Sequence, residues 1–450
     1  MNDTIAAIST ALGVGAISII RVSGPESIEI VNKIFKGKDL TQAESHTIHY
    51  GHIVDNQEII DEVLVSIMKS PKTFTTEDIV EINSHGGIST TNKVLELVLT
   101  NGARLAEPGE FTKRAFLNGR IDLVEADGIM NVIAAKTEKS RQQSINQLSG
   151  KVSFCIKELR KKLVEIISNI DVNIDYPEYE DIEEMTNEKI NPQLLKLKEE
   201  LESTIKKSEE GKIINQGLNV GIFGRPNVGK SSLLNALLEE EKAIVTDIEG
   251  TTRDTVEGII NLNGIMLNII DTAGIRETDN VVEKIGVEKS KTIMDQCDLC
   301  ILMLNNNESL TEEDLNLIKK IKNKKHIILI NKTDLESKLD FSQLPVEYLK
   351  ISVAEDQGID QLKEAVIKLF NLGELETDDL TYLSDARSIS LLKTSLSYIV
   401  EGIQAIENNE PIEIVEMNIK DAWESLGEII GETYKEELLD ELFSRFCLGK

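Results

Sequence analysis

A buried strand, a glycine-rich loop and a helix follow one another between residues 218 and 238. Leu218–Phe223 is an apolar run of strand length, and it leads directly into Gly224-Arg-Pro-Asn-Val-Gly-Lys-Ser231. Ser232–Leu238 then reads as a helix. Glycines let backbone N–H groups turn inward around phosphate oxygens, and the start of the helix adds its positive dipole end. The order of these three pieces predicts an α/β domain that binds phosphate groups.

Two motifs after the glycine-rich loop supply further groups for a nucleotide and its metal ion. Asp271-Thr-Ala-Gly274 follows the strand Met266–Ile270, and its aspartate can orient the water shell of magnesium while its glycine amide senses a γ-phosphate. Thr252 lies between the motifs, where a switch segment supplies a hydroxyl to magnesium. In the loop, Lys230 is placed to bridge the β- and γ-phosphates, and Ser231 to coordinate magnesium. These motifs predict hydrolysis of a nucleoside triphosphate.

A third motif identifies the base. Asn331-Lys-Thr-Asp334 ends the strand His326–Ile330, and the Asp334 carboxylate can accept both the ring N–H and the exocyclic amine of guanine. Adenine offers no such pair of donors and would leave a polar group unpaired, at a cost of a few kcal/mol, as an order of magnitude. Where many GTPases have Ser-Ala-Lys against the guanine, this chain has Ser352-Val-Ala354, whose backbone N–H groups can still serve. The sequence predicts GTP, not ATP.

The residue that usually positions the attacking water is absent. Ras-like switches carry a glutamine directly after the Asp-x-x-Gly motif, whereas this chain has the apolar Ile275. Arg253 and Arg276 are candidates for an arginine finger, although a surface salt bridge is an equally good interpretation of either. Another group must therefore orient the water and neutralise the developing charge.

The chain reads as three parts, consistent with its 450 residues. Short strand-like and helical runs over residues 1–118 predict an α+β domain. Residues 119–213 and 376–450 read as helical, with long helices over Lys151–Asp171 and Glu188–Glu210 and a loop over Asp175–Glu184. Residues 214–375 form the α/β GTPase domain, inserted into the helical one. The strand-like and helical runs of the first part are Ala16–Val22, Thr47–Val54, Glu62–Ser66, Ile79–Asn83 and Thr90–Asn101.

The net charge of the chain opposes binding to nucleic acid. The 49 basic and 78 acidic residues give a net charge of −29, which repels a polyanion at long range. A polynucleotide would have to contact a local basic run, although an ordinary solvated face is the commoner meaning of such a run. The runs are Lys113, Arg114 and Arg120, then 157–162, then 319–325. The absence of a long apolar stretch predicts no membrane span, and four cysteines without a disulfide-like pattern fit the cytoplasm.

Five segments together resemble the MnmE (TrmE) family of tRNA modification GTPases, and the resemblance covers essentially the whole chain. Three of them are G-domain motifs, shared in part with the Era and Der relatives, and the segments at the two ends of the chain are specific to the family. The five are Gly224–Asn235, Ala243–Asp254, Asp271–Glu277, Pro108–Gly119 and Phe446–Lys450. The family implies a Ras-like G domain inserted into a discontinuous helical domain, behind an N-terminal tetrahydrofolate-binding, dimer-forming domain.

The resemblance also implies how the missing glutamine is replaced. Family members are activated by potassium when two G domains meet face to face, and the ion sits where an arginine finger otherwise acts. The implied potassium ligands are Asn227, Thr246, Ile248 and Thr251, and the implied catalytic residues are Glu283, which orients the water, and Lys230. The implied magnesium ligands are Ser231 and Thr252. The residues expected to contact GTP are Gly224, Asn227, Val228, Gly229, Lys230, Ser231, Ser232, Thr246, Asp247, Ile248, Glu249, Gly250, Thr251, Thr252, Asp271, Thr272, Ala273, Gly274, Asn331, Lys332, Asp334, Ser352, Val353 and Ala354.

For the chemistry on RNA, the resemblance implies a folate site at Arg21, Glu81, Arg120 and Lys450. The folate would be a one-carbon donor, in its 5,10-methylene or 5-formyl form. The implied assembly is a homodimer joined to an FAD-dependent partner, MnmG, in a heterotetramer, with FAD on the partner. Together they would install an aminomethyl or carboxymethylaminomethyl group at C5 of the tRNA wobble uridine.

Two other functions stay open at this point. One is a GTP-switched RNA-binding or ribosome-assembly factor without nucleobase chemistry, and the other is a scaffold that uses GTP only structurally. Modified nucleosides in tRNA would separate the first from the family function, and potassium-stimulated phosphate release would exclude the second.

Overall fold

The structure is a computed structural model, and it describes residues 3–175, 187–240, 256–270, 294, 297–344, 347–370, 381–433, 436–446, 448 and 449. These residues fold into two compact units. The first takes residues from 1–130, 153–187 and 401–450, and the second from 131–152 and 188–400. Within the described ranges no helix is long and apolar enough to cross a bilayer. The three-domain boundaries expected from the sequence stay a prediction.

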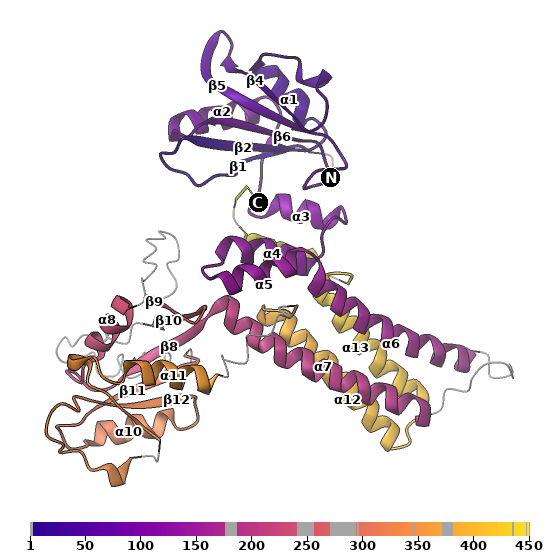
Figure 1. Cartoon of the computed structure of the whole chain (residues 1–450). Coiled ribbons are helices and arrows are strands. Elements are labelled where there is room, and N and C mark those ends of the chain that lie inside the picture. Colours follow the sequence, from indigo (N-terminus) through magenta and orange to yellow (C-terminus); the bar gives the residue numbers. More distant parts are fainter. Residues whose placement is uncertain are drawn as a thin grey trace, which may run out of the picture. The chain divides into compact units, whose positions relative to one another are not determined.

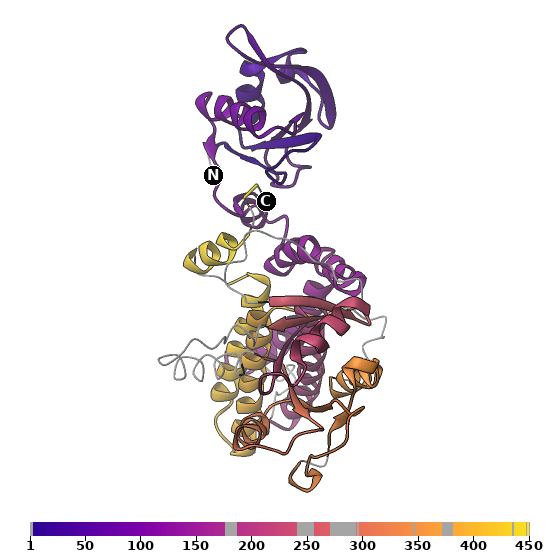
Figure 2. The same cartoon turned by 90° about the vertical axis from the view of Figure 1, so that its left-hand side faces the viewer.

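The N-terminal part of the first unit is built on a curved sheet (Figures 1 and 2) with strand order β3-β4-β5-β6-β2-β1-β7. Neighbouring strands are antiparallel except for the parallel pair β1 and β7. The four strands predicted in this region are confirmed, each with slightly different ends. The strands are β1 Ile5–Ile8, β2 Ile17–Ser23, β3 Phe35–Lys36, β4 Thr47–Asp55, β5 Glu58–Met68, β6 Ile79–His85 and β7 Arg104–Leu105.

Alternation along these strands separates a core face from a polar face. Val22, Val65 and Ile82 are buried and pack with residues of the helices α1 (Ser27–Ile34) and α2 (Ile88–Thr100). Because successive side chains of a strand point to opposite faces, the neighbouring positions on β2 and β6 face away from this core. A short turn of 3-10 helix, η1 (Leu40–Gln42), follows β3. The apolar core thus fixes which residues of the sheet are available to a ligand.

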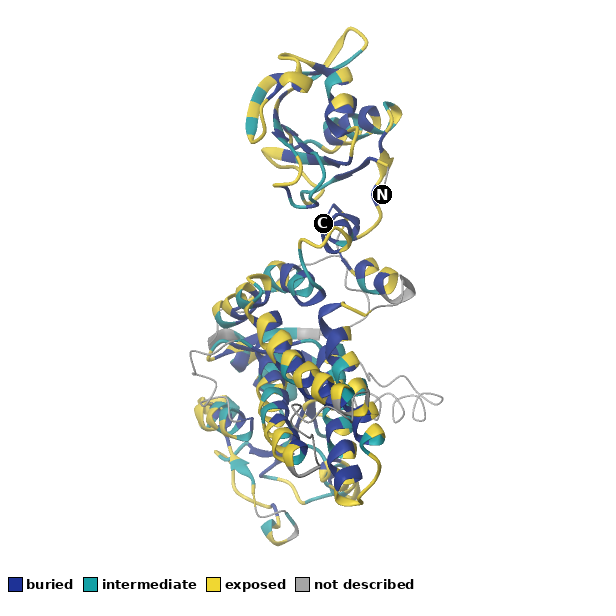
Figure 3. Cartoon of the chain, turned by 90° about the vertical axis from the view of Figure 1, so that its right-hand side faces the viewer, coloured by how far each residue is buried: buried dark blue, intermediate teal, exposed yellow. Residues whose placement is uncertain are grey.

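Long amphipathic helices precede and follow the α/β part of the chain. Each carries a buried stripe and an exposed stripe (Figure 3), as expected from apolar residues at 3.6-residue spacing. The two long helices predicted from the sequence are confirmed, although both extend further. The described part of the predicted 175–184 loop is limited to Asp175, which is the last residue of α6. The helices are α3 Glu110–Leu117, α4 Leu123–Ala134, α5 Glu138–Leu148, α6 Lys151–Asp175, α7 Asn187–Gln216, α12 Ala386–Glu407, α13 Ile412–Ile430 and α14 Glu436–Ser444.

The second unit contains a doubly wound α/β sheet with strand order β13-β12-β11-β8-β10-β9. All neighbouring pairs are parallel except β9 and β10, which form a hairpin. The predicted strands β8, β10 and β12 are confirmed. The elements are β8 Leu218–Phe223, α8 Lys230–Glu240, β9 Val256–Leu262, β10 Ile265–Ile270, β11 Leu299–Asn305, α10 Glu312–Ile321, β12 His326–Asn331, η2 Phe341–Gln343, β13 Leu349–Lys350, η3 Val353–Glu355 and α11 Ile359–Leu369.

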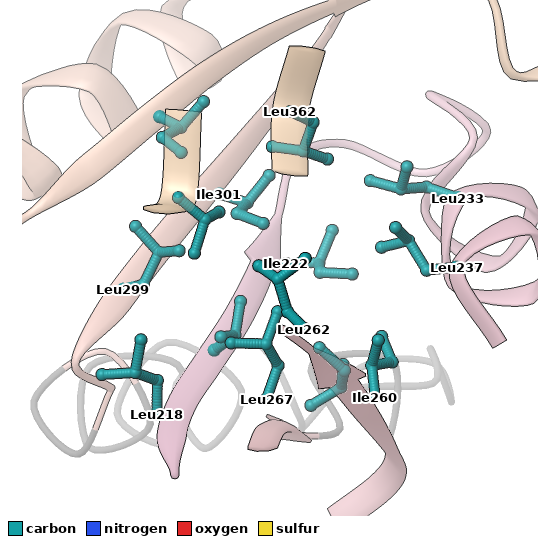
Figure 4. Packing of buried hydrophobic residues seen from close by; sticks show 14 of the residues in the cluster. Leu218, Ile222, Leu233, Leu237, Ile260, Leu262, Leu267, Leu299, Ile301 and Leu362 are labelled. Atoms are coloured by element: carbon teal, nitrogen blue, oxygen red, sulfur yellow. The ribbon is translucent and has the colours of Figure 1, made fainter. Parts of the chain in front are cut away.

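A large apolar cluster holds α8 against this sheet. Leu233 and Leu237 point from α8 toward strand residues that include Ile222 and Ile260 (Figure 4). Because β8, β11 and β12 are parallel neighbours, their carboxyl ends lie at one edge, where ligands of such sheets bind. The fold class expected from the sequence is confirmed. Along the chain, an N-terminal α+β domain comes first, and a P-loop α/β domain then lies between helical segments.

Candidate functional site

Two glycines shape the loop that follows the central strand β8. Gly224 has φ +138° and Gly229 has φ +105°, a region that only glycine adopts readily. A Cβ at Gly224 would collide with the backbone oxygen of Met303. A Cβ at Gly229 would collide with Nδ2, the side-chain amide nitrogen, of Asn331. Asn227, between the two glycines, is also left-handed, with φ +64°. The loop therefore packs too closely on the neighbouring strands for any larger residue at the two glycines.

Asn331, the last residue of β12, and Lys332, which follows it, brace this loop from one side. Asn331, buried at the end of β12, donates from Nδ2 to the Val228 carbonyl at 2.8 Å. Lys332 donates from Nζ to the Asn227 carbonyl at 2.9 Å. Both were predicted as GTP-binding residues, and the structure places them against the other predicted loop. The two segments form one rigid frame, although they are separated by about a hundred residues.

Lys230, the first residue of α8, lies folded back over its own loop. Its ammonium donates to the carbonyl oxygen of Gly224 and, at 3.1 Å, to that of Arg225. The side chain is half-buried, and burial lowers the pKa of this ammonium below its ordinary value. Ser231 and Ser232 follow in the first turn of the same helix, where free N–H groups and the dipole favour an anion. A phosphate can replace the two carbonyls as the partner of the ammonium.

The base-recognition segment is ordered by side-chain hydrogen bonds. The Ser352 hydroxyl donates to Oδ1 of Asp334 at 2.6 Å, and the Val353 amide donates to Oδ1 of Asn331 at 3.2 Å. The hydroxyl of Thr333 also donates to the Ile351 carbonyl at 2.9 Å. Val353 belongs with Ala354 to η3. Thus the Ser-Val-Ala segment, predicted to contact guanine, lies directly against the Asn-Lys-Thr-Asp motif.

Arg225 is a residue of the glycine-rich loop whose role the sequence motifs did not predict. From the second position of the glycine-rich loop it donates from Nε to Asp314 at 3.0 Å and from Nη2 to Glu308 at 3.0 Å. Asp314 is buried and also caps the start of α10, where it accepts from the Thr311 amide and hydroxyl. The only sequence signal was an arginine inside the loop, and its partners lie more than eighty residues away.

In the first unit, two predicted folate residues form an ion pair on the polar face of the sheet. Arg21 of β2 and Glu81 of β6 are register partners, and Arg21 Nε donates to Glu81 Oε1 at 2.9 Å. Arg21 Nη1 also donates to the Gly449 carbonyl at 3.1 Å. Ser9, which was not predicted, donates from its hydroxyl to the same carbonyl at 3.1 Å. The structure thus brings Gly449 to one of the predicted residues, Arg21, whose guanidinium also pairs with Glu81.

Arg120, the third predicted folate residue, makes different contacts. Its guanidinium donates from Nη1 to the Thr73 carbonyl at 2.8 Å and lies 5.5 Å from the centre of the Phe74 ring. Arg21 lies 5.8 Å from the centre of the Phe111 ring. Phe74 and Phe111 belong to one small apolar cluster. The two cations therefore cover rings of the same cluster without sharing a hydrogen-bond partner.

Several predicted site residues lie outside the described residues. They are Thr246, Asp247, Ile248, Glu249, Gly250, Thr251, Thr252, Asp271, Thr272, Ala273, Gly274, Glu283 and Lys450.

Family models match nearly the whole chain. The model described as the GTP-binding protein TrmE N-terminus matches residues 4–120, and the model described as the MnmE helical domain matches residues 123–447. The second match alone spans more than half of the sequence. The chain belongs to the MnmE family. The resemblance inferred from the five sequence segments is thereby confirmed.

Curated relatives agree over their full lengths. The chain is 53% identical over 455 residues to the tRNA modification GTPase MnmE of Bacillus mycoides (strain KBAB4), covering 100% of this chain and 99% of the relative. It is 52% identical over 460 residues to the tRNA modification GTPase MnmE of Bacillus licheniformis, covering 100% of both chains. The chain is therefore a GTP-binding enzyme, a GTPase of tRNA modification, with tRNA as the substrate of its pathway.

Two solved GTPase structures are similar to part of this chain. The G domain of the T. maritima FeoB iron transporter is 27% identical, with a TM-score of 0.26, over 34% of this chain and 98% of that one. An Aquifex aeolicus Era variant bound to GDP.AlF4- is 29% identical, with a TM-score of 0.27, over 40% of this chain and 66% of that one. At such TM-scores these similarities add nothing to the family assignment.

Proposed function

We propose that this chain is a potassium-activated GTPase that takes part in C5 aminomethyl or carboxymethylaminomethyl modification of the tRNA wobble uridine. The observation that carries the GTPase half is the frame formed by the Lys230 loop and the Asn331–Asp334 motif. This frame fits GTP for two reasons. The half-buried ammonium of Lys230 can bind phosphate, and the carboxylate of Asp334, held by Ser352, can bind the base. Ser231, together with Thr252, would hold magnesium.

Potassium is the proposed substitute for a catalytic glutamine. Asn227, with its left-handed backbone and its carbonyl bonded to Lys332, presents its side chain from a fixed position in the loop. An amide oxygen is a ligand type that suits potassium. Thr246, Ile248 and Thr251 would complete the site, and Glu283 would orient the water. The ion would supply positive charge to the transition state where two G domains of a homodimer meet.

Phosphate release measured in KCl and in NaCl at equal ionic strength tests this proposal. We expect at least tenfold faster turnover in KCl, as an order of magnitude for a lost electrostatic group. Asn227→Ala should remove the difference between the salts, and Glu283→Ala should slow turnover in both. Asn409→Ala is the matched control, because Asn409 is also left-handed, with φ +56°. Equal rates in both salts would contradict potassium activation.

A folate site is the second half of the proposal. Arg21, Glu81 and Arg120 combine two cations, a carboxylate and a small cluster of aromatic rings, which suits a flat heterocycle that carries an anionic tail. Lys450, which follows Gly449, would add a third cation. The bound group would be a tetrahydrofolate, in its 5,10-methylene or 5-formyl form, that supplies one carbon. An FAD-dependent partner, MnmG, would join the homodimer in a cytoplasmic heterotetramer.

The nucleosides of cellular tRNA test the reaction itself. Mass spectrometry of tRNA from a strain that lacks this chain should show loss of the C5 modification at the wobble uridine, restored by the intact gene. An unchanged modification profile would instead favour a GTP-switched RNA-binding or ribosome-assembly factor. We also propose residues 1–118, 119–213 with 376–450, and 214–375 as the folate-binding, helical and GTPase domains. Limited proteolysis that yields stable fragments with ends near residues 118, 213 and 375 would test those boundaries.

A further inference from the structure

A chain whose substrate is tRNA must bind a polyanion, yet its own net charge is −29. Long-range electrostatics therefore oppose binding, and a local group of cations has to provide it. The sequence offers three basic runs, and the structure now separates them by what their side chains already contact.

The run that contains Lys113, Arg114 and Arg120 is occupied by internal contacts. Lys113 pairs with Asp440, and Arg120 binds the Thr73 carbonyl. The Arg114 side chain is 0% exposed and bonds to Asp3, Glu77 and Glu110. As an RNA contact, this run is a weaker candidate, because Lys113 and Arg114 neutralise acidic groups of the same unit.

The 157–162 run is occupied in the same way. Lys157 pairs with Asp122 at 3.1 Å. Arg160 is buried, pairs with Glu432 and lies 4.4 Å from the centre of the Trp423 ring. This run is therefore a weaker candidate, since its central cation, Arg160, holds α6 to α13 and is closed to solvent, although Lys161 is exposed.

The third run differs, because its lysines point into solvent. Lys319, Lys320, Lys322 and Lys325 are exposed, and we call these four residues the lysine edge. No acidic residue occurs in the sequence between Asp314 and Asp334. In the part of the chain that the structure describes, no ion pair involves any residue of the lysine edge, whereas Lys324 binds the Met294 carbonyl. The lysine edge is therefore an exposed cationic surface that has no ion-pair partner among the described residues.

The dipole of α10 explains only two of the four lysines of the lysine edge. Lys319 and Lys320 lie in the last turn of α10, where a cation is favoured by the helix dipole. Lys322 and Lys325 lie beyond the helix, and Lys325 covers the Phe370 ring at 4.1 Å, beside the end of α11. Lys368, in the last turn of α11, precedes Phe370 by two residues. The contact between Lys325 and Phe370 therefore links the basic end of α10 and the turn after it to the basic end of α11.

The position of the lysine edge leaves the nucleotide site open. Lys325 immediately precedes β12, whereas Asn331 ends it, so the lysines and the nucleotide residues lie at opposite ends of the same strand. An RNA held at the lysine edge would not compete with GTP for space.

We propose that the lysine edge binds the phosphate backbone of tRNA. The proposal rests on tRNA being the substrate of this family, and it assigns the docking surface on an otherwise acidic chain. Lysine ammonium groups would contact phosphates as point charges, which gives affinity and a strong salt dependence without reading sequence.

The test measures binding of an unmodified tRNA transcript to the full-length protein over a range of NaCl concentrations. The variant carries Lys319→Gln, Lys320→Gln and Lys322→Gln. Its control carries Lys196→Gln, Lys198→Gln and Lys206→Gln on α7, which removes equal charge from the same unit where glutamates lie close by, such as Glu202 beside Lys198. The lysine-edge variant should bind roughly tenfold more weakly at low salt, with a salt slope smaller by about two to three. The control should bind like the unsubstituted protein.

Equal losses in both variants would overturn the proposal, because they would reflect net charge alone. No loss in the lysine-edge variant, or no tRNA binding by the unsubstituted chain at low salt, would also overturn it. GTP turnover is measured on the same samples and should stay unchanged in both variants. The docking proposal can therefore fail while potassium-dependent hydrolysis stands, and the two failures are distinguishable.

Discussion

The Ser352 hydroxyl lies 2.6 Å from Oδ1 of Asp334 and donates a hydrogen bond to it. This bond fixes one carboxylate oxygen before any base arrives, and it leaves the other oxygen and the remaining lone pair for guanine. Selection of the base is therefore partly built into the protein, because the carboxylate loses less freedom on binding than an unsupported side chain would.

Asp334→Asn should change the base that is accepted. The asparagine amide presents one acceptor and one donor where the carboxylate presents two acceptors. One N–H group of guanine would therefore face the NH₂ group of the asparagine, which is also a donor. The amide suits xanthine, which has an oxygen where guanine has its amine. We expect GTP affinity to fall by roughly a hundredfold and xanthosine triphosphate to become the better ligand. Competition between the two labelled nucleotides measures this, and an unchanged preference for GTP would contradict the assignment of Asp334.

Ser352→Ala should weaken binding without changing specificity. Loss of one hydrogen bond to a carboxylate is worth about 1 kcal/mol, or roughly fivefold in Kd for GDP. Ser352→Thr keeps the hydroxyl and should restore the affinity. Equal weakening in both variants, measured by calorimetric titration, would show that packing and not the hydroxyl matters.

Lys230→Met should make the stability of the nucleotide-free protein less dependent on pH. Burial lowers the pKa of Lys230 below its ordinary value of 10.5, so the folded chain binds this proton more weakly than the unfolded chain does. The resulting cost is fully present below the folded pKa and is relieved as the pH rises toward 10.5. The unsubstituted protein should therefore gain Tm relative to the variant between neutral and alkaline pH.

The nucleotide response of the same variant is its second readout. GDP should raise the Tm of the unsubstituted protein by mass action and leave that of Lys230→Met nearly unchanged. A parallel pH dependence of both proteins would contradict the buried-ammonium interpretation, and a preserved GDP response would contradict the role in phosphate binding.

Local patterns predicted the parts of this molecule that depend on neighbours in sequence. The apolar run of β8, its glycines and the polar ends of β10 and β12 are each readable within a few residues, so the phosphate loop and the base motif were found. The partners of Arg225 and Ser9 could not be found in this way, because Asp314 and Gly449 are far away in the sequence. The burial of Arg114 was missed for the same reason, since two of its three acidic partners, Asp3 and Glu77, are far away in the sequence.

Arg225→Ala should destabilise the GTPase domain and weaken GDP binding together. It removes the cation from Asp314, whose side chain is only 2% exposed and retains just the Thr311 donors. Removing one partner of a buried charge costs about 1–3 kcal/mol. Lysine at position 225 should rescue only part of the loss, because one ammonium cannot reproduce a fork that contacts two carboxylates.

The matched control for Arg225 is Arg141→Ala. Arg141 pairs with Glu138 on the surface of α5, with exposed fractions of 52% and 74%, and such a pair contributes at most about 1 kcal/mol. Thermal unfolding and GDP titration of the variants should separate them clearly. Equal Tm losses would mean that Arg225 acts as an ordinary surface residue.

Gly449→Ala should weaken folate binding while the fold is retained. Gly449 has φ +87°, and a Cβ there would collide with the Ile8 carbonyl oxygen on β1. The left-handed backbone alone costs a side chain about 1–2 kcal/mol, and the collision must push the end of the chain off Ser9 and Arg21. The Kd for 5-formyl-tetrahydrofolate, measured by equilibrium dialysis, should rise by roughly tenfold or more.

Gly264→Ala separates this effect from backbone strain in general. Gly264 lies in the second compact unit, whereas Gly449 lies in the first. Gly264 has φ +84°, but a Cβ there would meet only the flexible side chain of Lys139, at 3.2 Å. Its folate affinity should equal that of the unsubstituted protein, although its Tm falls by a similar amount. Ser9→Ala removes one of the two donors to the Gly449 carbonyl and should give an intermediate loss of affinity that Ser9→Thr restores. If Gly449→Ala binds the folate as tightly as Gly264→Ala does, the contacts of the Gly449 carbonyl with Ser9 and Arg21 are structural and do not position Lys450 for a ligand.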